Sequence, residues 1–555
     1  MAILLVLTVL LPLIGSLALF SMPRLPVTTA RSLALAITLA TLALSGVLVL
    51  GFKVGVDGPQ FAFLGESGQL GLPWMPRLGV RFALGLDGIS LLMFALTSLL
   101  MITAVFSSWT SVTERAPTHY ALLLALQTGL LGLFASLDVV LFYIFFEFTL
   151  IPLFFLIGLY GGPQRGKASV TFFLYTLAGS LLTLLGVIAL VAVHYQYSPD
   201  HVLTFSMPEL TQGLAKLGWA DWQQAHTWGE WRHGHAFWTT PQVLIFLLLF
   251  AGFAIKVPLF PFHTWLPLAH VEAPTAGSIL LAGVMLKVGS YGFLRFNMAM
   301  TPLGAQALYP LMATLAVAGI IYGALAALAQ TDVKRLVAYS SVSHMGFILL
   351  GLFSLNATGM EGAVIQMLNH GLTTGALFAC VGVIYERYHT RDMGELSGLW
   401  NRLPLWAFMF ILASMGSVAL PGLNGFIGEF PILLGMYRTS PMFAVWATLG
   451  MVLGAYYLLT MLQKVVFGPL KEPKAHHHDA SGHDHHGVPP MGWHEIAGLT
   501  PLLVLIVLIG VYPRPFLNLL KPPVAPIAAK FEAKAPVVAT IAPVPAPAAH
   551  GVVGH

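Results

Sequence analysis

The chain contains a succession of apolar segments that are each long enough to cross a lipid bilayer. A transmembrane helix needs about 20 apolar residues, and on that measure we predict roughly fourteen spans. They lie near residues 2–20, 31–51, 88–108, 119–137, 139–160, 168–195, 241–267, 275–297, 303–328, 335–355, 361–388, 403–437, 441–467 and 494–513. Only helices and closed barrels satisfy their backbone in lipid, and these runs are far too long for barrel strands. The sequence therefore predicts an all-α polytopic membrane protein in which strands are hard to place.

The composition agrees with a membrane protein and limits its chemistry. Charged residues make up 9% of the chain, whereas soluble proteins carry about 25%. The net charge of +4 comes without a run of Lys and Arg, so nothing indicates nucleic-acid binding. Cys380 is the only cysteine, which excludes a disulfide and a four-thiolate iron–sulfur cluster. No Gly-rich phosphate loop or dinucleotide fingerprint has the required spacing. We expect no cofactor in this chain.

Four ionisable residues lie inside the apolar segments. They are Glu147, Lys256, Lys287 and Glu429. A charge at the bilayer centre costs at least ~2.5–3.5 kcal/mol, so such residues indicate a functional site by default. A buried acid and a buried base stay charged while they are paired, and tend towards their neutral forms when they separate. Such pairs can move protons. The alternative is a static ion pair that locks two helices together.

Two of the predicted spans are interrupted near these charges. Pro258, Pro261 and Pro267 follow Lys256, and Pro421–Gly422 precedes Glu429. Proline removes a backbone donor and kinks or breaks a helix. A simple structural kink is the alternative explanation. Interrupted spans in corresponding places of two halves are typical of inverted-repeat transporters. We therefore predict two five-helix repeats, spans four to eight and nine to thirteen.

Two histidines lie between Lys287 and Glu429 in the sequence. His344 and His370 fall within the predicted tenth and eleventh spans, and histidine is suited to shuttling protons near neutral pH. Either one alone could be a hydrogen-bonded packing residue. Polar neighbours favour a hydrated lane instead: Ser340, Ser341, Ser343, Asn369, Thr373 and Thr374. His263 and His270 are seven residues apart but lack a third ligand for a zinc site.

The distribution of basic residues predicts the orientation. Thirteen Lys and Arg residues lie in the odd-numbered loops and seven in the even-numbered loops. The positive-inside rule then places the odd loops in the cytoplasm and both termini on the opposite side. The first span has no basic residue before Arg24, so we interpret it as an uncleaved span and not as a signal peptide.

Three polar segments lie outside the spans. Residues 196–240 form a predicted loop with five tryptophans, which we expect at the outer surface or against a neighbouring subunit. Residues 476–486 hold six histidines, a tract that can bind metal but has no defined ligand geometry. The tail, 521–555, carries seven prolines among alanines and valines and is predicted to be extended or disordered, or ordered by a partner.

Three sequence blocks resemble a known family. KVPLFPFHTWLPLAHVEAPTAGSILLAGVMLKVGSYG (256–292), DVKRLVAYSSVSHMGF (332–347) and LPGLNGFIGEF (420–430) resemble the antiporter-like subunits of respiratory complex I and of multisubunit cation/proton antiporters. The resemblance covers roughly residues 85–513. It implies that Glu147 and Lys256 form a coupled pair, that Lys287 is the central relay and that Glu429 is the exit group. It also implies that His344 and His370 are relay residues of its polar axis. The acid at Glu429 favours the complex I subunit type, because the other large subunits generally carry Lys there.

The resemblance also implies a setting for the chain. NADH, FMN, iron–sulfur clusters and quinone are expected in partner subunits, and the partners are neighbouring antiporter-like membrane subunits and the lipid bilayer. The location is a bacterial inner membrane, equivalent to the mitochondrial inner membrane. Leu268 stands where the bacterial pattern often has Asp, so no charge acts there. The alternatives are a subunit of a multisubunit sodium/proton antiporter and a structural spacer without transport.

These observations define the expected domain organisation. It comprises N-terminal spans in 1–118, a first repeat in 119–297, a second repeat in 298–470, a His-rich loop in 471–493, a C-terminal span in 494–520 and a Pro/Ala-rich tail in 521–555.

Overall fold

The computed structural model describes residues 1–56, 58–65, 69–198, 201–214, 241–473 and 488–532. Its first half contains α1 (Ala2–Ser21), α2 (Val27–Gly51), β1 (Leu72–Met75), η1 (Pro76–Leu78), β2 (Val80–Phe82), α3 (Gly88–Ser107), α4 (Ala116–Ala135), α5 (Val139–Phe148), α6 (Leu150–Tyr160), α7 (Arg165–Tyr197), α8 (Met207–Leu214), α12 (Pro241–Lys256) and α13 (Trp265–Glu272). Its second half contains α14 (Thr275–Leu280), η2 (Leu281–Met285), α15 (Leu286–Gly292), η3 (Phe293–Met298), α16 (Pro302–Ala307), α17 (Tyr309–Leu328), α18 (Val333–Leu352), α19 (Ala357–Tyr388), η4 (Leu399–Asn401), α20 (Pro404–Ser417), α21 (Asn424–Thr439), α22 (Pro441–Val465), α23 (Trp493–Val511) and α24 (Arg514–Glu532).

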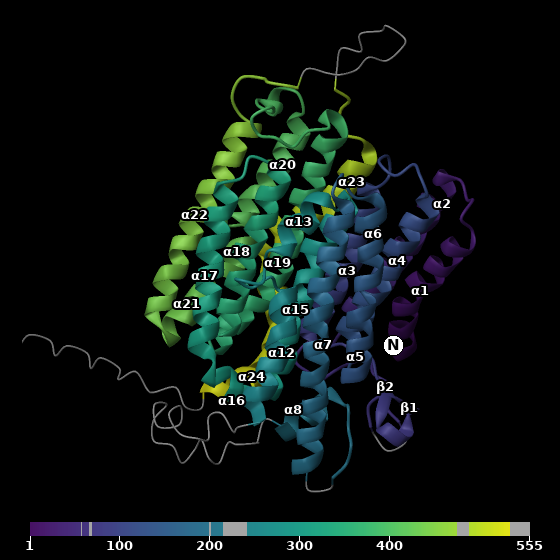
Figure 1. Cartoon of the computed structure of the whole chain (residues 1–555), viewed down its shortest axis with the longest axis vertical. Coiled ribbons are helices and arrows are strands. Elements are labelled where there is room, and N and C mark those ends of the chain that lie inside the picture. Colours follow the sequence, from purple (N-terminus) through teal and green to yellow (C-terminus); the bar gives the residue numbers. More distant parts are fainter. Residues whose placement is uncertain (57, 66–68, 199–200, 215–240, 474–487, 533–555) are drawn as a thin grey trace, which may run out of the picture.

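The long helices run roughly side by side from one end of the molecule to the other (Figure 1). Twelve helices of the described residues are long and apolar enough to cross a membrane, and two shorter apolar helices, α12 and α20, begin two further crossings. The sum is the fourteen spans that the hydropathy predicts, and their bounds agree within a few residues. The all-α polytopic fold class is confirmed.

The two broken helices run in opposite directions. α12 starts at the end of the bundle that carries the N-terminus, stops at Lys256, and continues after residues 257–264 as α13 (Figure 1). α20 starts at the other end, stops at Ser417, and continues after residues 418–423 as α21. The prolines predicted to break these spans lie in or beside the gaps, as expected from the backbone donors that they remove. This inverted arrangement places both breaks at mid-depth.

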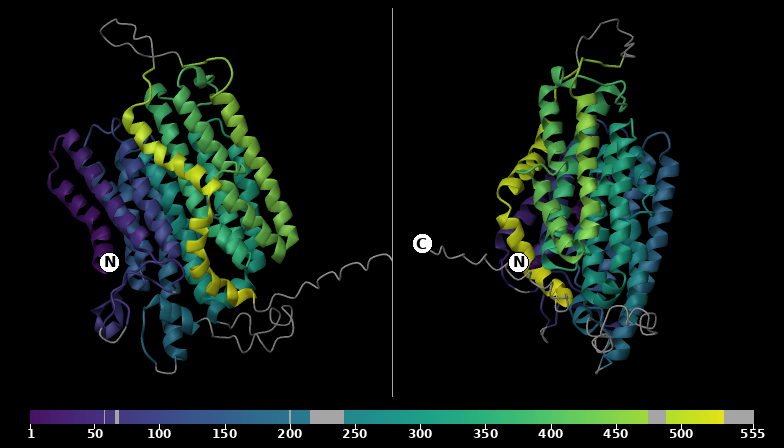
Figure 2. Two further views of the ribbon diagram at one scale, coloured as in Figure 1. Left: turned by 180° about the vertical axis from the view of Figure 1, so that it is seen from behind. Right: turned by 90° about the vertical axis from the view of Figure 1, so that its left-hand side faces the viewer.

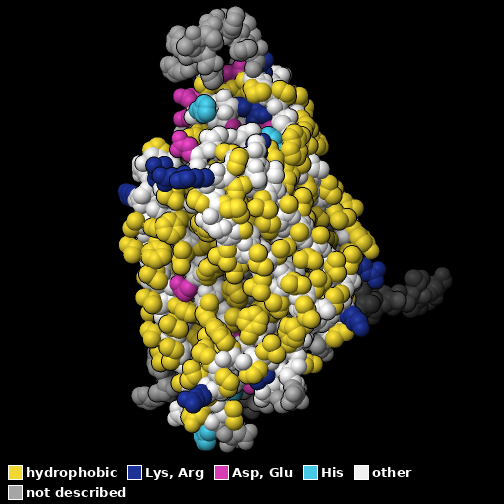
Figure 3. Space-filling view, turned by 90° about the vertical axis from the view of Figure 1, so that its right-hand side faces the viewer, with side chains coloured by type: hydrophobic (Ala, Val, Ile, Leu, Met, Phe, Trp, Pro, Cys, Tyr) yellow, Lys and Arg dark blue, Asp and Glu magenta, His cyan; other side chains and the backbone are white. Residues whose placement is uncertain are grey.

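Two spans form the centre of the bundle. Every residue is buried in the most apolar window of the span Thr275–Met298 and of α19. Outer helices such as α2 and α22 leave most of their residues at least partly exposed, and the large exposed side chains among them are apolar. On one broad face of the molecule, hydrophobic side chains cover most of the middle, with an acidic side chain among them, while most Lys, Arg, Asp and Glu lie towards the two ends (Figure 3). Such a belt is suited to lipid contact, and the buried lysines lie far inside it.

The structure corrects the sequence predictions for two segments between the spans. Other predicted features fall on residues that the structure does not describe. Strands β1 and β2 form a small antiparallel hairpin in the segment between the second and third spans. Residues 207–214 of the predicted loop 196–240 form the helix α8, while its five tryptophans lie outside the described residues. Residues 476–486, the histidine tract, also lie outside them.

The prediction of an extended tail is wrong for residues 521–532, which belong to α24. The C-terminal span also ends earlier than 520, at Val511, and α24 begins at Arg514. Three prolines lie inside α24 beyond its first turn, yet the helix forms because one face packs on the bundle. The buried positions of that face recur every three or four residues: Leu520, Val524, Ile527, Ala528 and Phe531. Burial of this apolar stripe outweighs the low intrinsic helix propensity of the segment.

Candidate functional site

The first pair of predicted residues lies where α12 ends against α5. Lys256 is 3% exposed, and its Nζ atom donates to the carbonyl of Phe146 at 3.4 Å and lies 3.8 Å from the centroid of that ring. Glu147 is the next residue of α5, and it attracts Lys256 electrostatically. In the described part of the chain, the two form no direct ion pair. Instead, Oε1 of Glu147 is buried without a hydrogen-bond partner. The lysine is held by an aromatic face and a carbonyl.

Lys287 lies at the centre of the bundle and directly contacts His370. Its Nζ is 2.6 Å from Nδ1 of His370, and it also donates to the carbonyl of Ala282. Lys287 is fully buried in α15, between the π-helical segments η2 and η3. Such π segments are frequent at functional sites because they shift the backbone register of a helix. Here they bring the Lys287 ammonium within hydrogen-bonding distance of the Ala282 carbonyl in η2.

Glycines allow α19, which carries His370, to pack closely against η2, the segment before Lys287. A Cβ added at Gly371 of α19 would lie 2.7 Å from the carbonyl oxygen of Gly283 in η2 and 2.6 Å from a methyl group of Leu96. Real Cβ atoms do not approach so closely. Glycine at position 371 is therefore required for α19 to pack on η2, and this packing sets the distance between Lys287 and His370.

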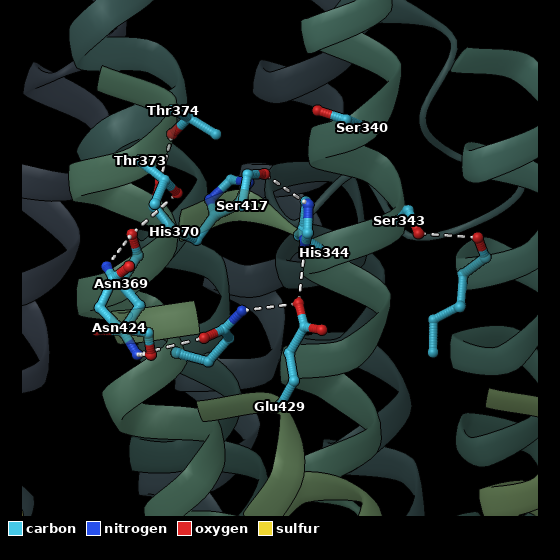
Figure 4. Close-up of polar contacts among 12 residues, drawn as sticks. Ser340, Ser343, His344, Asn369, His370, Thr373, Thr374, Ser417, Asn424 and Glu429 are labelled. Carbon is cyan, nitrogen blue, oxygen red and sulfur yellow. Dashed lines mark hydrogen bonds and ion pairs between the residues drawn. The ribbon is translucent and has the colours of Figure 1, made fainter. Parts of the chain in front are cut away.

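The axis continues from His370 to Glu429. The ring centroids of His370 and His344 are 5.5 Å apart. Nδ1 of His344 lies 3.0 Å from Oε1 of Glu429, and its Nε2 lies 3.1 Å from the Ser417 hydroxyl (Figure 4). Glu429 is 2% exposed and lies one turn into α21, beyond the break. Of the predicted residues, Lys287, His370, His344 and Glu429 thus form one continuous cluster. Glu147 and Lys256 form a second.

Two further residues contact the cluster but were missing from the sequence predictions. Gln366 donates from Nε2 to Oε1 of Glu429 at 3.1 Å, and Ser417 contacts His344 at the end of α20. Gln366 is one turn before His370 on α19, so helical spacing from His370 could have identified it. Ser417 has no such signal, because only the break between α20 and α21 brings it close to α18. Neither residue titrates; both fix the positions of groups that do.

Asparagines brace the break beside Glu429. Asn369 donates from Nδ2 to the carbonyl of Asn424 at 2.7 Å, and Asn424 donates from Nδ2 to the carbonyl of Asn369 at 3.3 Å (Figure 4). These bonds join α19 to the first residue of α21. The break in the second repeat is therefore held open by specific side-chain contacts. Asn369, one of the predicted polar neighbours, thus lies beside the break that precedes Glu429.

His270 links the cluster to the end of the bundle opposite the N-terminus. Its ring is fully buried, stacks on Phe378 at 4.6 Å, and has no hydrogen-bond partner on either nitrogen among the described residues. It interacts electrostatically with Lys287 and with Lys334. Lys334 donates to the carbonyl of Ala273 at 2.6 Å. His270 was considered from the sequence only as a metal ligand.

The geometry does not support a metal site in the part of the chain that the structure describes. No group of three His, Cys, Asp or Glu side chains is arranged to hold an ion there. His263 contacts the rings of Phe260 and Tyr322, whereas His270 contacts Phe378. The two histidines therefore contact different aromatic rings.

Comparisons with known proteins agree with this geometry. The family model described as NADH:quinone oxidoreductase/Mrp antiporter, TM, matches residues 136–454, which include both clusters. The chain belongs to this family. NADH-quinone oxidoreductase subunit M of Rhodobacter capsulatus is 40% identical over 507 residues, covering 91% of each chain. Subunit M of Escherichia coli K12 is 38% identical over 519 residues, covering 92% of this chain and 94% of the relative.

Solved structures of the family share the fold. A chain of respiratory complex I from Thermus thermophilus superposes with a TM-score of 0.80 at 32% identity, covering 95% of this chain and 99% of that one. A chain of the Mrp complex from Dietzia has a TM-score of 0.74 at 20% identity, covering 94% of this chain and 98% of that one, which shows the common fold alone. The acid at Glu429 predicted the subunit type called M in bacteria and chain 4 in mitochondria, and both relatives above carry the first of these names. The family resemblance is confirmed.

Proposed function

We propose that this chain is a membrane-arm subunit of NADH:quinone oxidoreductase that carries protons across the membrane. NADH oxidation and quinone reduction take place in partner subunits, which hold the FMN, iron–sulfur clusters and quinone. The observation that supports transport most strongly is the buried chain of contacts from Lys287 through His370 and His344 to Glu429. Ionisable groups at this depth are costly unless they have a function.

The relay chemistry follows from the ring nitrogens. Lys287 as an ammonium donates a proton to Nδ1 of His370. The neutral form of His344 that donates from Nδ1 to the Glu429 carboxylate leaves Nε2 to accept from Ser417. When Nε2 of His344 instead receives a proton, Nδ1 releases its own to Glu429. Each imidazole thus takes a proton on one nitrogen and releases it from the other.

The step between the two histidines requires a bridge or a rotation. Nε2 of His370 has no hydrogen-bond partner in the described part of the chain, and the two rings are tilted by 49°. Water connects polar groups that are too far apart for a direct bond. A bridging water, or rotation of one ring, completes the path.

Glu147 and Lys256 regulate the charge of Lys287. Because the Lys256 ammonium contacts α5 at Phe146 and is not ion-paired with Glu147 among the described residues, a small movement of α5 or α12 changes its distance to Glu147. With Glu147 close, Lys256 is stabilised as a cation; with Glu147 distant, the desolvated amine tends to lose its proton. We propose that this change drives the proton on Lys287 towards Glu429.

Glu429 releases the proton against the membrane field. Moving one elementary charge costs about 2.3 kcal/mol per 100 mV. Its carboxylate accepts from His344 and Gln366, so breaking or making these two bonds changes its proton affinity. α21 carries Glu429 on the far side of the break. A small hinge movement at the break can therefore make or break the hydrogen bonds from His344 and Gln366.

The outer helices support assembly with neighbouring membrane subunits. α21 and α22 expose large apolar side chains, including Tyr437, Met442, Trp446, Val452 and Tyr456. Aromatic and methionine side chains are enriched at protein interfaces. We propose that this face meets another antiporter-like subunit in the plane of the membrane.

We propose that both termini lie on the periplasmic side of a bacterial inner membrane. Cys380, the only cysteine, is buried, so single cysteines can be introduced on an unreactive background. Arg438→Cys and Asn401→Cys place thiols at exposed positions at opposite ends. An impermeant maleimide applied to intact spheroplasts should label the Arg438→Cys variant and not the Asn401→Cys variant. The reverse pattern would invert the proposed orientation.

Purification of the chain with its natural partners tests the function. A tagged chain should bring down a complex that oxidises NADH, reduces quinone and acidifies the outside of vesicles. A complex that exchanges sodium for protons without oxidising NADH would instead favour the antiporter alternative. Unchanged pumping in assembled variants of Lys256, Lys287, Glu429 and the partly exposed Glu147 would favour a structural spacer.

A further inference from the structure

A large cavity lies at the end of the bundle that carries the N-terminus, and its lining includes none of the residues of the proposed proton path. It has a volume of about 1290 Å³ and is open to the outside. Clefts for drug-sized ligands measure about 300–1,000 Å³. Its walls come from residues 52–56 and 58–59, the start of α3, the end of α4, α8, η3 and α24. α24 crosses this end on the back of the molecule (Figure 2). The size and the open side are suited to part of a long amphiphile.

The walls are mainly apolar. Phe52, Phe134, Leu137, Leu519 and Ile527 line the cavity. The cavity lies where spans begin and end, next to the apolar belt. A freely soluble ligand gains little from such walls, whereas an acyl chain gains roughly 0.8 kcal/mol for each buried CH₂.

The charged lining is cationic on balance. Asp87 and Arg295 form an ion pair at 2.5 Å, and both carboxylate oxygens of Asp87 accept from the same Nη2. Nε of Arg295 is buried and has no hydrogen-bond partner in the described part of the chain. Asp87 is thereby neutralised within the lining.

Lys530 is the second cation of the cavity, and it has no counter-ion among the described residues. Its Nζ donates to the carbonyl of Ala299 at 2.7 Å. In the part of the chain that the structure describes, it pairs with no carboxylate. Burial lowers the pKa of Lys530 to about 8, because desolvation disfavours the ammonium form. A half-buried ammonium group without an acid partner is stabilised by an external anion.

We infer that this cavity binds an anionic phospholipid, with its phosphate near Lys530 and the Arg295 guanidinium and its acyl chains along the apolar wall. Apolar walls favour a lipid over a free anion, and two cations against one acid favour an anionic head group over a zwitterionic one. The site is separate from the residues of the proposed proton path.

The test is lipid binding to the purified whole complex. The complex is delipidated and titrated with phosphatidylglycerol, phosphatidylcholine or inorganic phosphate, and bound species are counted by native mass spectrometry. Lys530→Gln should weaken phosphatidylglycerol binding about tenfold, equivalent to the loss of one charge-assisted contact. Lys521→Gln, an exposed lysine on the same helix, is the matched control and should change nothing.

A second variant tests the cavity without removing a charge. Ala525 lines the cavity, whereas Ala529 does not, and both are exposed on α24. Ala525→Trp should exclude the lipid and Ala529→Trp should not. Equal binding of phosphatidylcholine, binding of phosphate alone, or equal retention of phosphatidylglycerol by Ala525→Trp would each overturn the inference. So would electron density for a protein segment filling the cavity in the assembled complex.

Discussion

Lys287 and His370 are 83 residues apart in the chain, yet Nζ of the lysine is 2.6 Å from Nδ1 of the histidine. Both residues are completely enclosed by the central helices. No acid among the described residues pairs with Lys287, so the titratable group within hydrogen-bonding distance of its ammonium is the imidazole of His370. That arrangement is suited to proton transfer. It differs from a static ion pair that would only hold two helices together.

The Gly371–Gly283 contact should control proton transfer without carrying a proton. Gly371→Ala forces α19 and η2 apart, because the new Cβ would meet the Gly283 carbonyl at 2.7 Å. We expect a loss of about 1–3 kcal/mol of stability from overpacking and a lower proton-to-electron ratio. Gly46→Ala is the control, since its Cβ would meet nothing within 4 Å. The measurement is proton uptake in reconstituted vesicles, normalised to NADH oxidation. Equal ratios for the two variants would remove the contact from the mechanism.

Lys287→Arg should stop the relay although it keeps the charge. Arg cannot release its proton in a protein, so His370 would receive none. We expect the complex to assemble, to pump at least roughly tenfold more slowly through this subunit, and to lose coupled quinone reduction. Lys464→Arg, on the outer helix α22, is the control. Normal pumping by assembled Lys287→Arg would show that the position needs only a positive charge.

His344→Gln should interrupt the path between His370 and Glu429. Gln can hydrogen-bond to Glu429, but it has no second nitrogen that exchanges protons. We expect a pumping loss similar to that of Lys287→Arg. Ser417→Ala should cost far less, because Ser417 only positions Nε2 of His344. If Ser417→Ala were as damaging as His344→Gln, the histidine would serve mainly as a structural residue.

Glu147 and Lys256 should behave as one unit. The structure has them close enough to interact but not in direct contact. We therefore expect Glu147→Gln and Lys256→Ala each to reduce pumping strongly, and the double variant to be little worse than either single variant. A double-mutant cycle on the pumping rate should give a coupling free energy above about 0.5 kcal/mol. Purely additive effects would show that the two residues act independently.

Much of this arrangement can be predicted from the sequence. The spans follow from hydropathy, and the breaks after Lys256 and before Glu429 follow from proline and glycine. The buried charges and His344 and His370 stand out because polar residues are rare at that depth. Their contact in one cluster depends on the inverted packing of α18, α19 and α21, which local patterns do not encode.

Other features could not be predicted for physical reasons. Gln366 is uncharged, and glutamine more often faces solvent or packs than supports a relay. α24 was missed because its prolines favour an extended chain, while its helix depends on tertiary burial of Leu520 and Val524. The separation of Glu147 from Lys256 depends on how Phe146 intervenes, which is a matter of side-chain packing.

The most direct test of the proton path is the proton-to-electron ratio of the Glu429→Gln complex. Gln preserves size and can hydrogen-bond to His344 and Gln366, but it cannot accept a proton from the axis. The complex, reconstituted in vesicles, is supplied with NADH and quinone, and proton uptake is measured against NADH consumed. The proposed path predicts an assembled complex with a lower ratio and no net transfer through this subunit. A ratio equal to that of the wild-type complex would contradict it.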